Sequence, residues 1–126
     1  MKQQIALLTG AIFGGLSVAL GAFGAHAWKS MLEANGRLET FEVAVRYQMV
    51  HSLALLIAGL LMTQAENKLY LQRASACWTV GIVLFSGSLY GLSFSSMKAV
   101  AWLTPFGGLF FLIGWSFLAV SILKNK

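Results

Sequence analysis

No charged side chain occurs in AVAWLTPFGGLFFLIGWSFLAVSIL, residues 99–123 of this chain. A transmembrane helix needs about 20 predominantly apolar residues to cross roughly 30 Å of hydrocarbon, so this stretch is long enough to span a bilayer. Residues 3–28, 47–65 and 74–97 are likewise free of charge, and the second of them is only just long enough. Uninterrupted apolar runs lack the alternation of barrel strands, and lipid permits only barrels or helices. The sequence therefore predicts four transmembrane helices.

The composition leaves little of the protein outside the bilayer. Of 126 residues, 58% are hydrophobic and only 10% are charged, so almost every apolar side chain belongs to a span. We predict an all-α integral membrane four-helix bundle that forms one transmembrane domain. The predicted spans within residues 1–126 are residues 5–27, 47–64, 74–94 and 99–123. The first imitates a secretory signal, but its apolar run is longer than the roughly 7 to 15 residues of such signals, and we expect it to remain as a helix.

The charged residues indicate a lipid bilayer, not a nucleic acid, as the partner. The formal net charge is +5, but the nine basic residues are spread one or two at a time between the spans and form no patch. We expect them to anchor the helices beside lipid headgroups.

Metal-dependent and enzymatic functions are disfavoured by what the spans contain. Cys77 is the only cysteine, there are two histidines, and no carboxylate lies in a span, so we expect neither a metal nor a cofactor. Ser86 and Ser88 have no acidic partner in any span, so we do not expect an enzyme. The missing carboxylate also disfavours a proton-coupled multidrug exporter.

The segment between the first two spans is the longest one outside the bilayer. Asn35-Gly36 predicts a turn, after which a helical pattern resumes. We expect either a short interfacial helix between spans one and two or an extension of the second span. Glu42 and Arg46 stand four residues apart on it and are expected to form an ion pair at the interface.

Small residues predict where the helices pack most closely. On the first span they recur along one face at three- and four-residue spacing, at Gly10, Gly14, Ser17 and Gly21. Such a stripe lets two backbones approach inside a membrane, where packing holds helices together. We expect the same of Gly107 and Gly108 on the fourth span, and we interpret all six as packing positions.

The start of the fourth span has two interpretations. Thr104 is a suitable N-cap, and Pro105 suits the first helical position because no amide donor is needed there. The alternative is a longer span that begins near residue 99 and kinks at Pro105.

The positive charges favour one orientation by a small margin. With four spans the termini share a side, where five basic residues stand (Lys2, Lys68, Arg73, Lys124 and Lys126) against four on the other side (Lys29, Arg37, Arg46 and Lys98). The positive-inside rule then places both termini in the cytoplasm. Because the counts are so close, dual orientation with oppositely inserted copies stays open, as does a homo-oligomer in general.

Polar residues of the spans gather toward one side of the membrane. The same topology brings together His26, Tyr47, Gln48, His51, Ser86, Ser88, Tyr90 and Thr104. Polar groups in lipid either line a cavity or bond to neighbouring helices. The first reading predicts a polar pocket for a small solute, ion or proton, with His51 and His26 at its mouth. The alternative is an accessory or scaffold protein of a membrane complex or lipid environment, in which these residues only cross-link helices.

Four motifs carry a family resemblance that covers nearly the whole chain. They are GAFGAH at residues 21–26, YQMVHSLA at 47–54, LFSGSLY at 84–90 and TPFGG at 104–108. In this order they resemble a family of small bacterial inner-membrane proteins, the domain of unknown function 423 family. The resemblance implies a multi-pass protein of the bacterial plasma membrane with four helices, and it implies no substrate or reaction.

Overall fold

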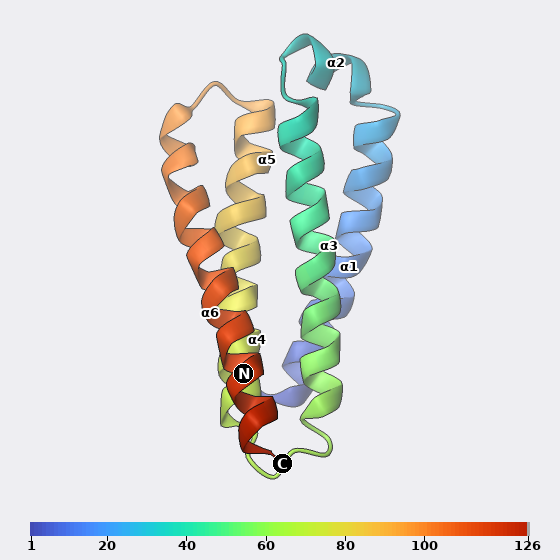
Figure 1. Cartoon of the computed structure of the whole chain (residues 1–126). Coiled ribbons are helices and arrows are strands. Elements are labelled where there is room, and N and C mark those ends of the chain that lie inside the picture. The colour runs from blue at the N-terminus through green and yellow to red at the C-terminus, as the bar shows by residue number, and fades with distance from the viewer. Residues whose placement is uncertain (126) are drawn as a thin grey trace.

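The computed structural model describes residues 1–125 and consists of four long helical runs (Figure 1). The first two runs are α1 (Gln3–Ala25) and α3 (Leu38–Leu61), with the short α2 (Lys29–Ala34) between them. The third comprises α4 (Leu69–Gly81), the π-helical segment η1 (Ile82–Ser86) and α5 (Gly87–Phe94). The fourth comprises the 3-10 segment η2 (Lys98–Trp102) and α6 (Leu103–Lys124). All four runs are long and apolar enough to cross a membrane, which confirms the predicted all-α membrane fold.

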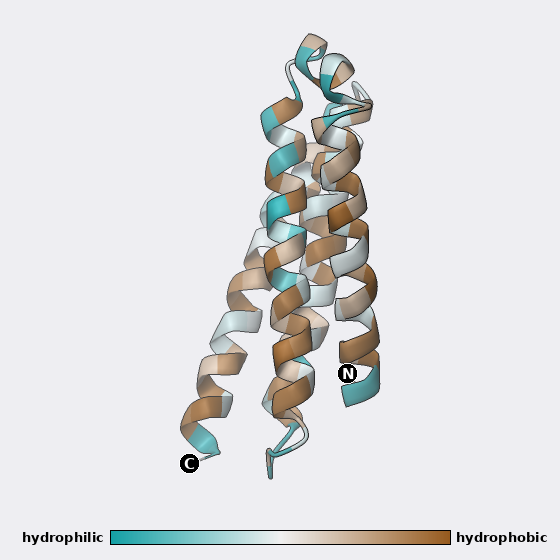
Figure 2. Cartoon of the chain, turned by 90° about the vertical axis from the view of Figure 1, so that its right-hand side faces the viewer, coloured by the Kyte–Doolittle hydropathy of each residue, from teal (hydrophilic) through white to brown (hydrophobic). Residues whose placement is uncertain are grey.

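Large apolar side chains cover the outside of the bundle. Leu8, Leu60 and Leu112 are 62%, 61% and 67% exposed, although leucine is normally buried in a protein that water surrounds. Figure 2 shows that the hydrophobic residues extend along the length of the helices and that hydrophilic residues lie at the two ends, with further hydrophilic residues within one of the long helices. This distribution fits helices that hydrocarbon surrounds.

The helices pack as two pairs that meet along α3. In Figure 1, α1 lies along α3, and α6 lies along the run of α4 and α5, which itself packs against α3. Both termini lie at the same end of the bundle (Figure 1). There the amino group of Met1 donates to the Gln72 carbonyl at 3.4 Å, and the Asn125 side chain bonds to the backbone of Asn67.

The predicted turn at Asn35-Gly36 ends α2. Gly36 has a φ of +64°, a left-handed conformation that glycine adopts without strain. Its N–H donates to the Glu33 carbonyl at 3.0 Å, and the N–H of Arg37 donates to the Leu32 carbonyl at 2.8 Å. This pair of bonds satisfies the last carbonyls of the helix. A short helix thus lies between the first two spans, but it precedes the turn, whereas we expected it after the turn. The segment after the turn extends the helix of the second span, which was the other expectation.

The helix of the second predicted span, residues 47–64, consequently begins at Leu38. No proline or glycine interrupts residues 38–46, so the helix continues beyond the hydrocarbon. Glu42 and Arg46 are both exposed on this extension, and no ion pair joins them within residues 1–125. The predicted pair is therefore not formed, in keeping with the small stabilisation that exposed pairs provide.

The helical run that contains the third predicted span begins at Leu69 and includes a π-helical segment that we did not predict. A π-helical turn inserts an extra residue and rotates the side chains that follow it. Here the backbone of Phe85 lies directly against Gly107 of α6, and Ser86 faces α3. The π-helical segment thus contacts both α3 and α6 at the same level of the bundle.

The fourth span begins before Thr104, and the predicted N-cap is wrong. Trp102 occupies the N-cap position of α6, and Thr104 lies within the first turn. The Thr104 hydroxyl lies 2.6 Å from the Ser88 hydroxyl and so links α6 to α5. The alternative start near residue 99 agrees with the 3-10 segment, which begins at Lys98.

The small residues of α1 face α3. A Cβ atom at Gly10 would lie 2.9 Å from the Ser52 carbonyl oxygen, and one at Gly21 would lie 3.3 Å from a methyl group of Val45. Gly14 lies on the same face with more room, and Ser17 is buried and donates to the Gly14 carbonyl at 2.7 Å. Gly107 has no room for a Cβ atom beside Phe85, whereas at Gly108 the nearest atom would be 3.9 Å away. The backbones of α1 and α3 are thus in direct contact at Gly10.

Candidate functional site

Gln48 joins three helices near the middle of the bundle. Its side-chain nitrogen donates to the Phe13 carbonyl in α1 at 2.8 Å, and its side-chain oxygen accepts from the Tyr90 hydroxyl in α5 at 2.7 Å. Gln48 is only 3% exposed. A buried amide is costly unless it is hydrogen-bonded, so both ends of this side chain are used to hold α1, α3 and α5 together.

His51 links α3 to α6. Its Nδ1 lies 2.7 Å from the Tyr47 carbonyl, and its Nε2 lies 3.1 Å from Nε1 of Trp115. Because an indole nitrogen only donates, Nε2 is the acceptor, and Nδ1 carries the proton and donates to Tyr47. The ring stacks on Phe111 with 3.6 Å between centroids and 8° between planes. This buried imidazole is therefore neutral, and both of its nitrogens have partners.

Three hydroxyl groups make two further contacts between helices. Ser86 donates to the Ala44 carbonyl of α3 at 2.7 Å. Ser88 donates to the Phe85 carbonyl at 2.8 Å, which leaves Thr104 as the donor in the contact between the Ser88 and Thr104 hydroxyls. Ser86 and Ser88 are almost completely buried, and both are satisfied within the protein.

The predicted polar cluster is therefore divided among separate contacts. The structure brings Gln48 to Tyr90, His51 to the backbone of Tyr47, and Ser88 to Thr104. His26 is exposed at the end of α1, where the neighbouring Gly24 packs on Phe41. Phe41 precedes His51 by ten residues on α3, or about 15 Å at 1.5 Å per residue. The two histidines consequently do not share a pocket mouth, contrary to our expectation.

Aromatic side chains fill the bundle between the level of Gln48 and the end that carries α2. Trp28 stacks on Phe23 at 4.9 Å between centroids and packs edge-on against Phe94 at 5.2 Å. Phe41 contacts Trp28, Phe94 and also Tyr90, whose hydroxyl reaches Gln48. Toward the other end the core is apolar, with Leu55, Met62, Leu71, Ala74 and Trp78 at most 2% exposed. Apolar layers thus lie on both sides of the polar contacts.

An open groove follows α3 and α6 in front of His51. It has a volume of about 510 Å³ and is lined by Tyr47, His51, Phe85, Pro105, Gly108, Leu109, Phe111, Leu112 and Trp115. A hollow of about 390 Å³ shares Tyr47, His51 and Trp115 with it and adds Arg46 and Val50. Leu112 and Trp115 are exposed on the outer surface of the span, so the groove opens toward lipid.

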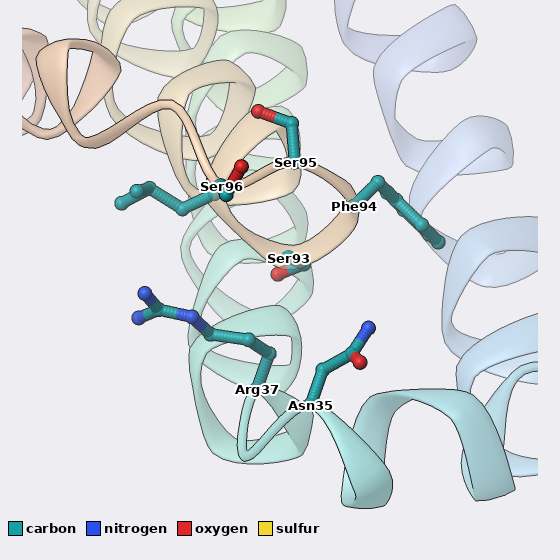
Figure 3. A pocket seen from close by; sticks show the side chains of 7 residues that line it. Asn35, Arg37, Ser93, Phe94, Ser95 and Ser96 are labelled. Atoms are coloured by element: carbon teal, nitrogen blue, oxygen red, sulfur yellow. The ribbon is translucent and has the colours of Figure 1, made fainter.

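A second, polar pocket lies at the end that carries α2. Figure 3 shows Asn35 and Arg37, which precede α3, on one side, and Ser93, Ser95 and Ser96, at the end of α5, on the other. Its volume is about 290 Å³. None of the predicted pocket residues lines it. Sequence reasoning missed it because nothing local indicates that the turn before α3 faces the end of α5.

Trp115 and Phe111 are the site residues that sequence reasoning missed. They stand four apart on α6 and therefore share the face that meets His51. Trp115 donates its indole N–H to His51 although its ring is 43% exposed, whereas the N–H of the buried Trp78 has no partner within residues 1–125. Within residues 1–125, no group of three or more His, Cys, Asp or Glu side chains is placed to hold a metal ion.

Comparison with known proteins identifies the family. The family described as "Protein of unknown function (DUF423)" matches residues 20–108. A UPF0382 membrane protein of Haemophilus influenzae is 42% identical over 126 residues, which cover 100% of this chain and 98% of the relative. A UPF0382 membrane protein of Staphylococcus haemolyticus is 36% identical over 122 residues, covering 97% and 98% of the two chains. The UPF0382 inner membrane protein YgdD of Escherichia coli is 36% identical over 126 residues, covering 100% and 95%.

No solved structure matches this chain significantly. The relatives are all described as membrane proteins, in agreement with four apolar runs that are long enough to span. Their match extends over both helix pairs and includes every residue of the contacts described above. The chain is therefore a multi-pass membrane protein that belongs to the DUF423 family.

Proposed function

We propose that this protein is a non-enzymatic, non-transporting accessory or scaffold protein of the membrane. The observation that carries the proposal is that both ring nitrogens of His51 and both ends of the Gln48 amide already have partners within the protein. A proton relay needs a group that is free to accept and release a proton, and a solute site needs free polar groups at a hydrated cavity. The polar side chains of the spans instead hold four helices in one arrangement.

Proton flux into vesicles separates this function from transport. The purified protein in liposomes with an internal pH-sensitive dye is expected to show no proton flux above that of protein-free liposomes under an imposed potential. His51→Ala is expected to lower the unfolding temperature in detergent, because it removes the bond from Trp115 and the ring that stacks on Phe111. A flux in the wild type that His51→Ala abolishes would instead make the protein a proton transporter.

We also propose that both termini lie in the cytoplasm. The support is the excess of basic residues on the side of the termini, five against four, together with the position of both termini at one end. Reporter fusions after residue 35 and at the C-terminus test it, using an enzyme that is active only outside the cytoplasm and a fluorescent protein that folds only inside. Equal signals of both reporters at both sites would show dual orientation.

A further inference from the structure

The groove between α3 and α6 has to be filled when the protein lies in a bilayer. Leu112 and Trp115 line it and are 67% and 43% exposed on the outer face of the spans, so hydrocarbon has direct access. An empty groove there would forfeit van der Waals contacts along its whole lining. Either a lipid chain or the helix of another protein must occupy it.

The size of the groove favours a lipid chain. The stack of His51 on Phe111 and the bond from Trp115 to His51 close the space behind it, so that only a shallow slot of about 510 Å³ remains. A transmembrane helix with a diameter of about 10 Å and a length of about 30 Å occupies roughly 2,400 Å³. A helix could lie across the opening but could not enter it, whereas an acyl chain fits inside.

Arg46 places a positive charge at one end of the groove. It is the last charged residue before the uncharged run 47–65, and His51 lies five residues further along α3, or about 7.5 Å deeper. Arg46 lines the hollow that continues the groove past Tyr47, is exposed, and has no ion pair within residues 1–125. Arg46 also lines a recess of about 520 Å³ between α1 and α3, which it shares with Glu42, but Glu42 does not line the hollow on the α6 side. A phospholipid carries its phosphate at the membrane boundary and extends its acyl chains inward. A cation at this boundary beside an apolar groove is therefore complementary to a phospholipid.

We propose that the groove between α3 and α6 binds an anionic phospholipid, with its phosphate on the guanidinium of Arg46 and an acyl chain along the slot over Trp115. Arginine suits this role because its guanidinium donates to two phosphate oxygens at once. The inference deepens the proposed function, since it names one partner in the lipid environment. The two proposals are tested independently, because lipid binding is measured by mass spectrometry and the proposed function by proton flux.

Native mass spectrometry of the purified full-length chain tests the proposal. The protein is titrated with phosphatidylglycerol and with phosphatidylcholine of the same acyl chains. Both lipids carry a phosphate, but the choline cation of the second leaves it without net charge, so the first is expected to bind about tenfold more tightly to a cationic site. Arg46→Gln is expected to remove this preference. Arg37→Gln is the matched control, because it removes the same charge at the same end of the bundle but outside the groove. Leu112→Trp fills the slot and is expected to weaken the binding of both lipids.

Four outcomes would overturn the proposal. Equal binding of the two lipids would show that the groove does not select for an anionic phospholipid. Loss of the preference in Arg37→Gln but not in Arg46→Gln would assign the anion to the polar pocket of Figure 3. Displacement of the lipid by inorganic phosphate alone would indicate a site for the free anion. A stable dimer that Leu112→Trp dissociates, with no lipid retained, would show that a second copy covers the groove.

Discussion

The two contacts that α3 makes on opposite sides are built in different ways. Toward α1 the contact consists of small residues, and a Cβ atom at Gly10 would already lie 2.9 Å from the Ser52 carbonyl. Toward α6 it consists of rings and one hydrogen bond, with His51 between Phe111 and Trp115. The first contact leaves no slot at the level of Gly10, whereas the second leaves a groove.

The difference shows how a small membrane protein can be rigid and still accept a partner. Small residues bring the backbones of α1 and α3 together at the level of Gly10, whereas a recess of about 520 Å³ remains between these helices near Gly21 and Gly24. Between α3 and α6, large side chains bridge the two helices at the level of His51, and a groove of about 510 Å³ remains in front of them. Three experiments measure how strongly α3 is held to its neighbours at these contacts and at Gln48.

The largest effect is expected from Gly10→Leu, at the contact with α1. The new side chain has no room beside Ser52 and Leu56, so α1 and α3 must separate, at a cost of about 3 kcal/mol in the free energy of unfolding. The measurement is helical circular dichroism during unfolding by SDS in mixed micelles. Gly15→Leu is the control, because nothing lies within 4 Å of a Cβ atom there. If both variants were destabilised equally, helix propensity or insertion would be responsible and not the contact.

A smaller effect is expected from Gln48→Leu, where α1 and α5 share a partner. The substitution keeps the volume but leaves the Tyr90 hydroxyl and the Phe13 carbonyl without their bonds, so we expect a loss of about 1–2 kcal/mol. The same unfolding experiment measures it, with Gln4→Leu at the exposed start of α1 as the control. Restoration of stability by adding Tyr90→Phe to Gln48→Leu would locate the loss in the unpaired hydroxyl. No recovery in the double variant would mean that the hydroxyl finds another partner.

The number of spans and the packing face of α1 could be predicted from the sequence because each depends on local pattern. The uncharged runs fixed four crossings, and the spacing of Gly10 and Gly21 indicated the face that meets α3. The exact ends of the helices could not be predicted. The helix of the second span continues past Arg46, since a helix does not stop where the hydrocarbon does.

Partners of polar side chains depend on the depth and rotation of each helix, which no local pattern determines. Ser88 and Thr104 were predicted to lie together, and their hydroxyls meet, but His26 and His51 do not share one pocket mouth, because about 15 Å of helix separates their levels. The π-helical segment rotates Ser86 toward Ala44, and a regular helical pattern cannot predict that rotation. The Trp115 donor was not predicted, because no local pattern places its indole N–H beside His51.

The smallest effect is expected for the hydrogen bond between Trp115 and His51. Its measurement shows whether this bond or ring packing joins α3 to α6 beside the groove. A double-mutant cycle of Trp115→Phe and His51→Phe measures the coupling free energy, which for interhelical hydrogen bonds in membranes averages about 0.6 kcal/mol. We expect a value near this average, because the rings of His51 and Phe111 still stack when the bond is absent. Trp102→Phe supplies the control cycle, since this tryptophan is 75% exposed and should show no coupling to His51. A coupling close to zero for Trp115 as well would mean that ring packing alone joins α3 to α6. The groove would then be free to widen, and a helix could enter where the bond now limits the space to an acyl chain.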